Sequence, residues 1–419
     1  MPLEIGFAKV DITPESPAPL AGYVTKKERI FDRIRDRVHA RALFLRNHES
    51  SACIVSIDLL TIHRELRNAV QAEVERQGLA IDFLLHCTHT HSSIGGYWDA
   101  AAAKKFCGAY SKELFDHLTK KLAQAVVESA KDLRPASFAS ASIDLPGFNE
   151  NRRDMAGGPL DPEMIVCEFK FAGGKAALVN YAGHPVIAAE KDFMALSADY
   201  PGALCAKLEE EYDFAIYVNG GVGGTSIIFP PGIRDCGEHL EFVAEGLLQG
   251  AQKAIAKLKP RDFNSNPVIA TQVVAHEFPA DPIRAFPGSW KAINFLARPI
   301  SSYLERYLKD AKATGPVRLH NVRIGKLALV GQPTDAGVGL ALEIKRAAKQ
   351  AGFDRCIVAS HCDEYSGYMH MPADYAFPFY KNEDKFMVIY ENIMSLLGPG
   401  AGAVMLSKET EMLKELADR

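Results

Sequence analysis

The sequence predicts an α/β protein in which mixed sheets are layered with helices. Short apolar, β-branched segments alternate with longer segments of helical period. The predicted strands also outnumber what one open sheet usually holds, which favours two layered sheets. The chain of 419 residues is 47% hydrophobic and 24% charged, so it can bury a large core. No repeat or linker marks a boundary, and we expect one domain over residues 1–419.

The predicted strands share an apolar, β-branched composition bounded by turn residues. In chain order they are residues 39–46, 52–60, 83–89, 164–171, 175–183, 214–221, 268–276, 326–333 and 355–362.

Three helices are predicted between these strands. The clearest covers 111–132, because apolar residues recur there every four positions and form one stripe. These residues are Leu114, Leu118, Leu122 and Val126. The second covers 237–258 and ends before Pro260, and the third covers 337–350 and ends near Gly352.

The segment 260–316 is the least regular part of the chain and is rich in proline. It is interpreted either as an insertion that packs on the main body or as a lid or substrate wall.

Composition excludes several classes of partner. The net charge of -4 gives no general affinity for nucleic acid or acidic lipid. No apolar run approaches the ~20 residues that cross a bilayer, and the N-terminal residues do not resemble a secretory signal. The eight cysteines are scattered without a CxxC pair, which is typical of reduced thiols. We therefore expect a cytoplasmic protein.

Polar residues follow five of the predicted strands directly. In α/β folds ligands bind beyond the carboxyl ends of strands, so these loops are expected to meet in one crevice. The residues are His89 and His91; His184; Asn219 to Ser226; Gln332 and Asp335; and His361, Asp363, Glu364 and Tyr368.

The two histidines in Cys87-Thr88-His89-Thr90-His91 stand two positions apart. If the strand continues through them, both rings face the same way. Imidazole is a common metal ligand and also carries protons near neutral pH. The pattern therefore indicates a metal or catalytic site, although polar loop histidines that only form hydrogen bonds give the same pattern.

The glycine-rich segment Asn219–Ser226 lacks the lysine of a phosphate-binding P-loop. It is interpreted as a tight turn that lets backbone approach a substrate and displays Ser226. A turn without any ligand remains the alternative.

Several of these stretches together resemble the catalytic N-terminal domain of the neutral/alkaline non-lysosomal ceramidase family. They keep the family's order and span residues 5 to about 380. They are GFAKVDITP, RIRDRVHARAL, VSIDLL, THTHSSIGG, NENRR, the GHP of YAGHP, SADYPG, NGGVGGTS and the tyrosine spacing in GYMHMPADYAFPFY.

The resemblance implies a single catalytic domain that hydrolyses a linear amide with the help of Zn²⁺. It implies that His89 and His184 bind the metal, that Tyr368 completes the metal shell, and that residue 332 occupies a further ligand position. It also implies that His91 carries the proton. The remaining implied roles concern the substrate: Arg152 orients it, Ser226 lies beside it, and Tyr380 hydrogen-bonds its carbonyl region.

These roles fit elementary chemistry. A zinc ion polarises an amide carbonyl and lowers the pKa of bound water to about 7. A nearby imidazole can give a proton to the departing amine, and phenol and guanidinium donors stabilise the developing oxyanion.

Two departures from the family pattern bear on the metal and on Ser226. Gln332 stands where the family has a glutamate ligand, and a neutral amide does not offset a dication. Metal affinity should fall unless Asp335, Asp363 or Glu364 enters the shell. Ser226 keeps its place but lacks the preceding acid and the following proline, which leaves its role open.

A third departure concerns length. The resemblance implies family members that are made as precursors with a signal peptide and that carry a C-terminal β-sandwich domain. We expect neither feature here. The substrate is therefore expected to be a small-molecule or lipid-like amide, with a soluble N-acyl amide at least as favoured as ceramide, a sphingolipid.

Two alternatives stay open. Ser226 could act as a nucleophile with His91 as base, in a serine-dependent esterase or lactonase. The chain could also be a non-catalytic binding protein whose metal site has degraded at Gln332.

Overall fold

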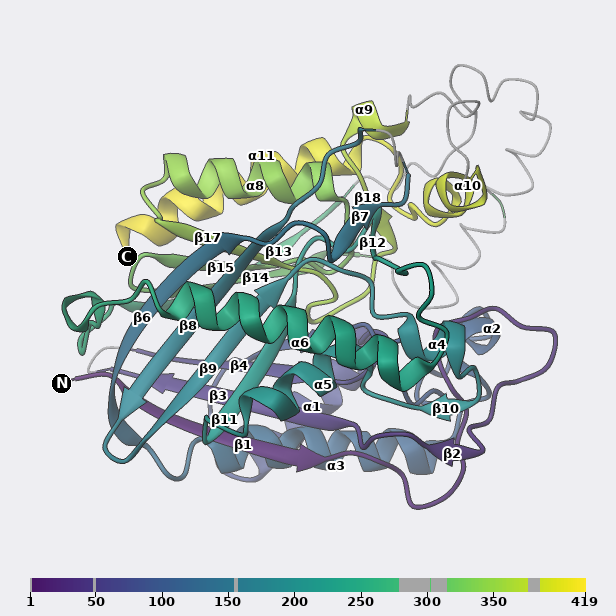
Figure 1. Ribbon diagram of the computed structural model, residues 1–419, viewed down its shortest axis with the longest axis horizontal. Helices are drawn as coiled ribbons and strands as arrows, with labels where there is room; N and C mark the ends of the chain where they lie inside the picture. The colour runs from purple at the N-terminus through teal and green to yellow at the C-terminus, as the bar shows by residue number, and fades with distance from the viewer. Residues whose placement is uncertain (1, 48–49, 154–156, 279–301, 303–314, 376–384) are drawn as a thin grey trace.

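The computed structural model describes residues 2–47, 50–153, 157–278, 302, 315–375 and 385–419. Within these ranges the strands form sheets whose outer faces are covered by helices (Figure 1). The predicted α/β class with mixed, layered sheets is confirmed.

The largest sheet in the described chain has eight strands in the order β11-β9-β8-β6-β1-β3-β4-β5. β1 (Glu4–Asp11) and β6 (Arg134–Asp144) pair at only two positions, so the sheet divides there into two halves. The first half adds β3 (His39–Arg46), β4 (Ser51–Ile57) and β5 (Leu84–Cys87). The second half adds β8 (Glu163–Phe171), β9 (Gly174–Tyr181) and β11 (Phe214–Asn219).

A separate four-stranded sheet has the order β13-β14-β15-β17 among the described residues. It contains β13 (Ile269–His276), β14 (Val317–Ile324), β15 (Leu327–Gly331) and β17 (Arg355–Ala359). Short two-stranded pairs join the loops at one end of the molecule. They are β2 (Arg33–Ile34) with β10 (Ala195–Leu196), β7 (Asn149–Asn151) with β12 (Thr225–Ile227), and β16 (Asp335–Ala336) with β18 (Tyr368–Met369).

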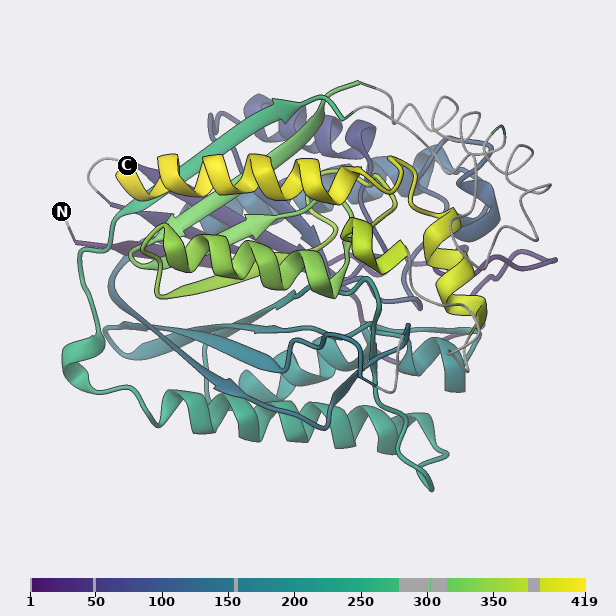
Figure 2. The same ribbon diagram turned by 90° about the horizontal axis from the view of Figure 1, so that it is seen from above.

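Each of the three sheet units has its own pair of covering helices. α1 (Arg64–Arg76) and α3 (Lys112–Ser129) cover the first half-sheet. α5 (Asp199–Leu208) and α6 (Cys236–Ile255) cover the second. α8 (Val338–Gln350) and α11 (Ala401–Asp418) run side by side over the four-stranded sheet (Figure 2). Shorter helices are α2 (Lys104–Cys107), α4 (Ile187–Lys191), α9 (Pro372–Tyr375), α10 (Lys385–Ile393) and the 3₁₀ turn Pro260–Asp262.

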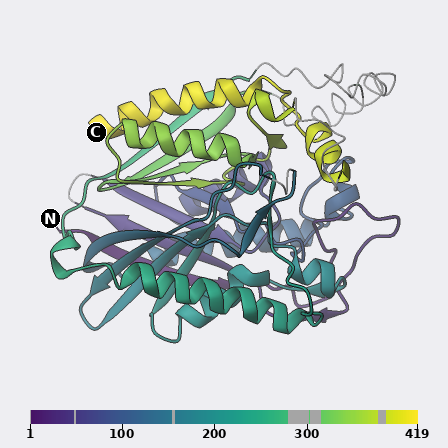
Figure 3. The same cartoon turned by 45° about the horizontal axis from the view of Figure 1, so that its top comes forward.

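The sheets enclose an inner core made almost entirely of strand residues. Apolar side chains from all three sheet units meet there, for example Ile54, Ile216 and Leu329. The opposite faces of the sheets pack on the helix pairs, so the helices lie outside and the sheets inside (Figure 3). Burying strands on both faces requires the continuous apolar runs that the sequence shows.

Each predicted strand contains an observed strand, and the three predicted helices correspond to α3, α6 and α8. α3 is capped by Ser111, whose hydroxyl accepts from the backbone N–H of Leu114. In the predicted stripe of α3, Leu118, Leu122 and Val126 are buried and Leu114 is half-buried.

Part of the predicted insertion belongs to the main body. Within 260–316, residues 269–276 form β13 and pair with β14 in the four-stranded sheet. Residues 279–314, apart from 302, lie outside the described residues, so the prediction of a lid concerns a segment of which nothing is described.

Two further expectations were tested. Each of the eight cysteines lies in the described chain, and each is buried and free. Among the described helices, none combines the length and the apolar character needed to cross a membrane.

Within the eight-stranded and four-stranded sheets, three pairs of neighbouring strands run parallel: β4 with β5, β9 with β11, and β15 with β17. Polar loops leave the carboxyl ends of all three pairs. The side chains of these loops contact one another at one end of the molecule, as the following geometry shows.

Candidate metal centre

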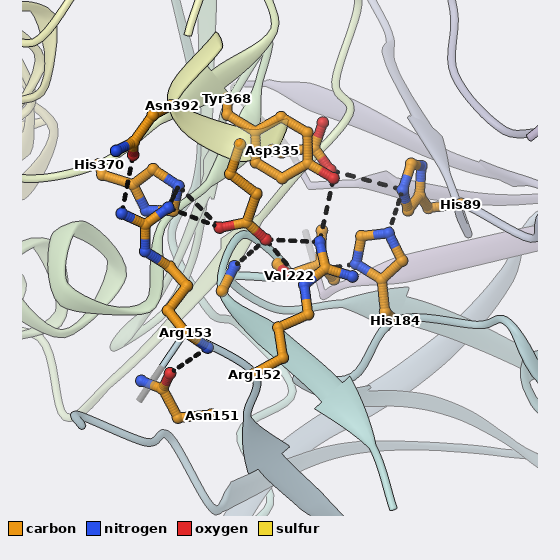
Figure 4. A network of polar contacts seen from close by, with 12 residues as sticks. His89, Asn151, Arg152, Arg153, His184, Val222, Asp335, Tyr368, His370 and Asn392 are labelled. Carbon is orange, nitrogen blue, oxygen red and sulfur yellow. Dashed lines mark hydrogen bonds and ion pairs between the residues drawn. The ribbon is translucent and has the colours of Figure 1, made fainter. Parts of the chain in front are cut away.

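Three histidines form what we call the imidazole cluster: His89 and His91, which follow β5, and His184, which follows β9. The Nε2 atom of His89 lies 2.9 Å from Nε2 of His184 and 3.2 Å from Nε2 of His91. His89 and His184 point toward each other (Figure 4). Their rings are perpendicular, at 85°, so their nitrogen lone pairs can converge on one point. The first and second strand-end loops of the prediction therefore meet.

The histidines converge for a reason that differs from the predicted one. β5 ends at Cys87, and His89 has a left-handed φ of 69°. The strand alternation expected to align His89 with His91 is therefore interrupted. A residue other than glycine is strained in the left-handed region, and it keeps that conformation only where surrounding contacts hold it. Here the backbone N–H of His89 donates to the carbonyl of Leu59, and the backbone N–H of His91 donates to the carbonyl of Pro185.

Backbone carbonyls fix the protonation of two of these rings. Nδ1 of His89 lies 2.7 Å from the Leu60 carbonyl, and Nδ1 of His184 lies 3.2 Å from the Val222 carbonyl. A carbonyl oxygen only accepts, so each Nδ1 carries the hydrogen and each neutral ring presents a bare Nε2 lone pair. Two lone pairs thus face each other at 2.9 Å with no hydrogen between them.

Burial keeps the cluster uncharged. It lowers the pKa of His89 to about 3, with a further contribution from His361. Burial likewise lowers the pKa of His184 and of His91 well below the ordinary value. Protonation is therefore an expensive way to relieve the facing lone pairs, whereas a metal cation accepts both of them.

A carboxylate and a fourth imidazole adjoin the cluster. Oδ1 of Asp335 lies 3.4 Å from Nε2 of His89 and 3.1 Å from Nε2 of His361. Among the described residues, two sets of three side chains hold ligand atoms within 4.8 Å of one another: His89, His91 and His184, and His89, Asp335 and His361. This part of the molecule is therefore a candidate metal site.

Gln332, at the predicted further ligand position, has its side-chain contact outside the imidazole cluster. The Gln332 side chain is fully buried, and its amide N–H donates to Oε1 of Glu409 in α11 at 2.8 Å. The described side-chain contact of Gln332 therefore lies with α11 and not with the imidazole cluster. Burial raises the pKa of Glu409 to about 7, partly offset by the amide donors of Asn321 and Gln332.

The two other acids named as substitutes are also committed to other partners. Asp363 contacts His320 and Arg318 at 3.1 and 3.2 Å. Glu364 pairs with Arg64 at 2.6 Å. Of the three acids that the sequence offered to replace the missing glutamate, only Asp335 has a described contact with the imidazole cluster.

A second buried group, the Glu391 cluster, holds Arg152. Glu391 in α10 is fully buried and accepts from Arg152, Arg153 and the backbone N–H of Gly224, while His370 lies 3.1 Å away. Burial alone would raise the pKa of Glu391, but Arg152, His370 and Arg153 outweigh it and lower that pKa. The carboxylate therefore stays charged and anchors the guanidinium.

Arg152 also reaches the residue predicted to complete the metal shell. Its Nη2 donates to the hydroxyl of Tyr368 at 3.0 Å (Figure 4). Tyr368 lies in β18 directly opposite Asp335 of β16, so the phenol and the carboxylate are held by one short backbone pairing. Tyr380 lies outside the described residues.

The glycine-rich loop packs closely against another backbone segment of the protein. A Cβ on Gly223 would lie 2.7 Å from the carbonyl oxygen of Asp335, and the backbone N–H of Gly223 donates to Ala336. The close approach that we predicted toward a substrate is thus made toward the Asp335 segment. The same loop supplies the Val222 carbonyl that orients His184.

A cavity of about 550 Å³ opens beside the imidazole cluster. Its walls carry both charged and apolar side chains, including Glu150, Glu190, Val24, Val186 and Phe229. His91, His184, Arg152, Ser226 and Tyr368 also line it.

Ser226 lies in β12 and is half-buried, and among the described residues its hydroxyl makes no hydrogen bond to a histidine. A larger groove of about 1090 Å³ lies at the amino ends of β9 and β11, far along the strands from these loops, and no histidine lines it.

Two contributors were not identified in the sequence. Glu391 belongs to a segment without any motif, and only its contacts reveal it. His361 was noted only as a polar residue after a strand, and its contact with Asp335 depends on how β15 and β17 pair.

Comparisons with known proteins concern the family and the fold. Residues 3–165 match the model of the family described as neutral/alkaline non-lysosomal ceramidase, N-terminal. The neutral ceramidase of Pseudomonas aeruginosa is 25% identical over 194 residues, which cover 42% of this chain and 29% of the relative. Neutral ceramidase A of Dictyostelium discoideum is 29% identical over 160 residues, which cover 36% of this chain and 22% of the relative. The matched segments thus span less than a third of each relative's length.

Solved structures extend the likeness to the whole fold. The crystal structure of the Pseudomonas aeruginosa neutral ceramidase superposes with a TM-score of 0.81 at 19% identity, covering 100% of this chain and 75% of that one. A ceramidase complexed with C2 gives a TM-score of 0.80 at 17% identity, covering 100% of this chain and 76% of that one. The predicted resemblance is thus confirmed: residues 3–165 match the family's model, and the chain has the fold of the solved neutral ceramidase.

Proposed function

We propose that this protein is a Zn²⁺-dependent hydrolase of a linear N-acyl amide. The observation that carries the proposal is the pair of Nε2 lone pairs of His89 and His184, which face each other at 2.9 Å while both Nδ1 hydrogens are held by carbonyls. Neutral rings in that arrangement repel unless a cation accepts both lone pairs. The names of the relatives support a hydrolase of the ceramidase kind.

The side chains around the cluster suit amide hydrolysis. A zinc ion held there would act as a Lewis acid toward an amide carbonyl. His91 lies next to both other imidazoles and lines the cavity, so it can give a proton to the departing amine nitrogen. Because burial disfavours its charged form, a protonated His91 would release its proton readily.

Arg152 and Tyr368 would bind the oxygen of the scissile amide. The guanidinium of Arg152 is held by Glu391 and reaches the Tyr368 hydroxyl, so two donors lie together on the cavity wall. Donors fixed before the reaction stabilise charge that develops on that oxygen without having to reorganise.

The cavity supports a substrate with both polar and apolar parts. Its volume of about 550 Å³ falls in the range of pockets that hold small organic molecules. Val24, Val186 and Phe229 would contact an acyl portion, and Glu150 and Glu190 would face a polar amine portion. We propose an N-acyl amide of this kind, either ceramide or a smaller soluble amide.

The test separates ligands from the proton carrier. Replacing His89 or His184 with Ala should abolish both bound zinc, measured by elemental analysis, and hydrolysis of short-chain N-acyl amides. His91→Ala should abolish hydrolysis and keep the zinc. Full zinc content in His184→Ala would refute the proposal, and hydrolysis that survives chelators and is blocked by a serine-directed phosphonate would point to Ser226 instead.

A further inference from the structure

We propose that Asp335 is the carboxylate ligand of the metal and that His361 is its positioning residue. The inference rests on the proposed function, since it names further parts of the same metal shell. It starts from Gln332, whose amide N–H donates to Glu409 and whose side chain carries no charge to offset a dication.

The first argument concerns the contact between Asp335 and His89. Nε2 of His89 has no hydrogen, because Nδ1 donates to the Leu60 carbonyl. Oδ1 of Asp335 lies 3.4 Å from this nitrogen, so two acceptors face each other in a fully buried place. Such a contact is unfavourable by itself and becomes favourable when a cation binds both atoms.

The two distances measured from His89 suit ligands of one ion. Two ligand atoms that each lie about 2.1 Å from a zinc ion are about 3.0 to 3.4 Å apart. Nε2 of His89 lies 2.9 Å from Nε2 of His184 and 3.4 Å from Oδ1 of Asp335. His89 belongs to both sets of ligand atoms that lie within 4.8 Å of one another, so it would join His184 to Asp335, and an ion bound by all three would draw these two side chains together. The three residues come from different strand-end loops and would supply two neutral nitrogens and one negative charge.

The second argument excludes His361 from the same ion. Its ring stacks on that of His89, with centroids 3.8 Å apart and planes within 12°. An imidazole binds a metal through a lone pair in its own ring plane, so an ion in the plane of His89 lies well outside the plane of His361. The rings of His91 and His184, by contrast, are at 87° and 85° to His89.

His361 instead orients the carboxylate. Its Nε2 donates to Oδ1 of Asp335 at 3.1 Å, while the hydroxyl of Thr61 donates to its Nδ1 at 3.3 Å. The Tyr365 hydroxyl donates to Oδ2 at 3.0 Å, so each oxygen of Asp335 has one donor. Neighbours of this kind fix the direction of a ligand and are worth 10- to 100-fold in metal affinity.

The backbone supports this role of His361. His361 has a left-handed φ of 58°. Strain of this kind is retained where neighbouring structure requires it. It directs the ring between His89 and Asp335, and the backbone N–H of His361 donates to Thr334, the residue before Asp335.

The experiment measures the dissociation constants of Zn²⁺ and Co²⁺ by chelator competition, together with the visible spectrum of bound Co²⁺. Asp335→Asn should raise the dissociation constant by at least about 100-fold and change the Co²⁺ spectrum. His361→Leu should raise it by about 10- to 100-fold, whereas His361→Gln, which keeps a donor, should restore most of that loss and leave the Co²⁺ spectrum as in the parent.

The controls use the same buried region. Glu364→Gln removes a carboxylate near by that pairs with Arg64, and it should leave the dissociation constant unchanged. Circular dichroism of the metal-free variants checks folding, because a folded Asp335→Asn that loses metal has lost a ligand.

The outcomes separate this inference from the proposed function. If His184→Ala loses metal while Asp335→Asn stays within threefold of the parent, the function stands and Asp335 is not a ligand. If His361→Gln binds as poorly as His361→Leu with an altered Co²⁺ spectrum, His361 is itself a ligand and the inference is wrong. If the parent protein binds neither metal, the proposed function fails as well.

Discussion

The imidazole cluster and the Glu391 cluster are both buried, and both border the same cavity, but their charges are arranged in opposite ways. In the Glu391 cluster one carboxylate meets two guanidinium groups and a backbone N–H, so donors and acceptors match. In the imidazole cluster acceptors face acceptors, at 2.9 Å between His89 and His184 and 3.4 Å between His89 and Asp335.

This difference in charge arrangement separates a cluster that stabilises the fold from a cluster that binds a ligand. A group whose charges are already compensated needs no ligand and stabilises the fold. A group in which hydrogen-bond acceptors face one another lacks a positive charge between them. It therefore favours the binding of a cation. The Glu391 cluster therefore positions Arg152, and the imidazole cluster takes a cation.

The largest expected effect follows from the Glu391 cluster. Glu391→Gln leaves two buried guanidinium groups without their carboxylate and should lower the free energy of unfolding by about 3 to 5 kcal/mol. Asp335→Asn, measured in metal-free protein, should leave it nearly unchanged or raise it, because it removes an acceptor that faces another acceptor. Urea unfolding of both variants measures the two changes in the free energy of unfolding. Equal losses in Glu391→Gln and Asp335→Asn would contradict the difference that we describe between the two clusters.

An intermediate effect concerns pH. Burial lowers the pKa of His86 from 6.5 to about 3. Below pH 6.5 the unfolded chain therefore binds a proton that the folded protein does not, so this histidine makes the protein less stable as the pH falls. Its contribution between pH 6.5 and pH 4.5 is about 2 kcal/mol.

The depressed pKa of Glu391 acts in a separate window. Its stabilisation is complete above the ordinary carboxyl pKa of 4.5 and is lost only at lower pH. The raised pKa of Glu409 acts in the opposite direction to that of His86, so the difference between the parent and His86→Gln is the quantity to measure. If the free energies of unfolding of the parent and of His86→Gln changed with pH in the same way, the role given to His86 would be wrong.

The smallest expected effect is at Gln332. Gln332→Glu would place a second carboxylate against Glu409 and away from the described contacts of the imidazole cluster. We expect no gain in zinc affinity beyond about threefold, measured by chelator competition. A gain of tenfold or more would mean that residue 332 can enter the shell, and it would favour the alternative of a degraded metal site.

The sequence was informative where local pattern decides structure. The apolar runs that became β5, β9, β11, β15 and β17 were visible as strands, and so were the polar residues after them. Fold-level reasoning about strand ends then brought His89 and His184 together correctly. The same reasoning placed Asp335 after a strand, and the departure from the family pattern at Gln332 made it one of three acids that could replace a missing ligand.

The rest depended on tertiary contacts that a sequence does not display. The left-handed turn at His89 ended the expected alternation, yet the ring still reached the cluster. The burial of Gln332 against Glu409 joins residues 77 positions apart. Glu391 contacts Arg152 from 239 positions away and belongs to a helix without a motif.

The three proposed ligands come from three sheet units, each with its own covering helices: His89 after β5, His184 after β9 and Asp335 after β15. One ion would therefore cross-link three layers that also share the inner core. Its binding free energy would add to the cohesion of the whole molecule, and loading the site would delay the separation of all three layers together.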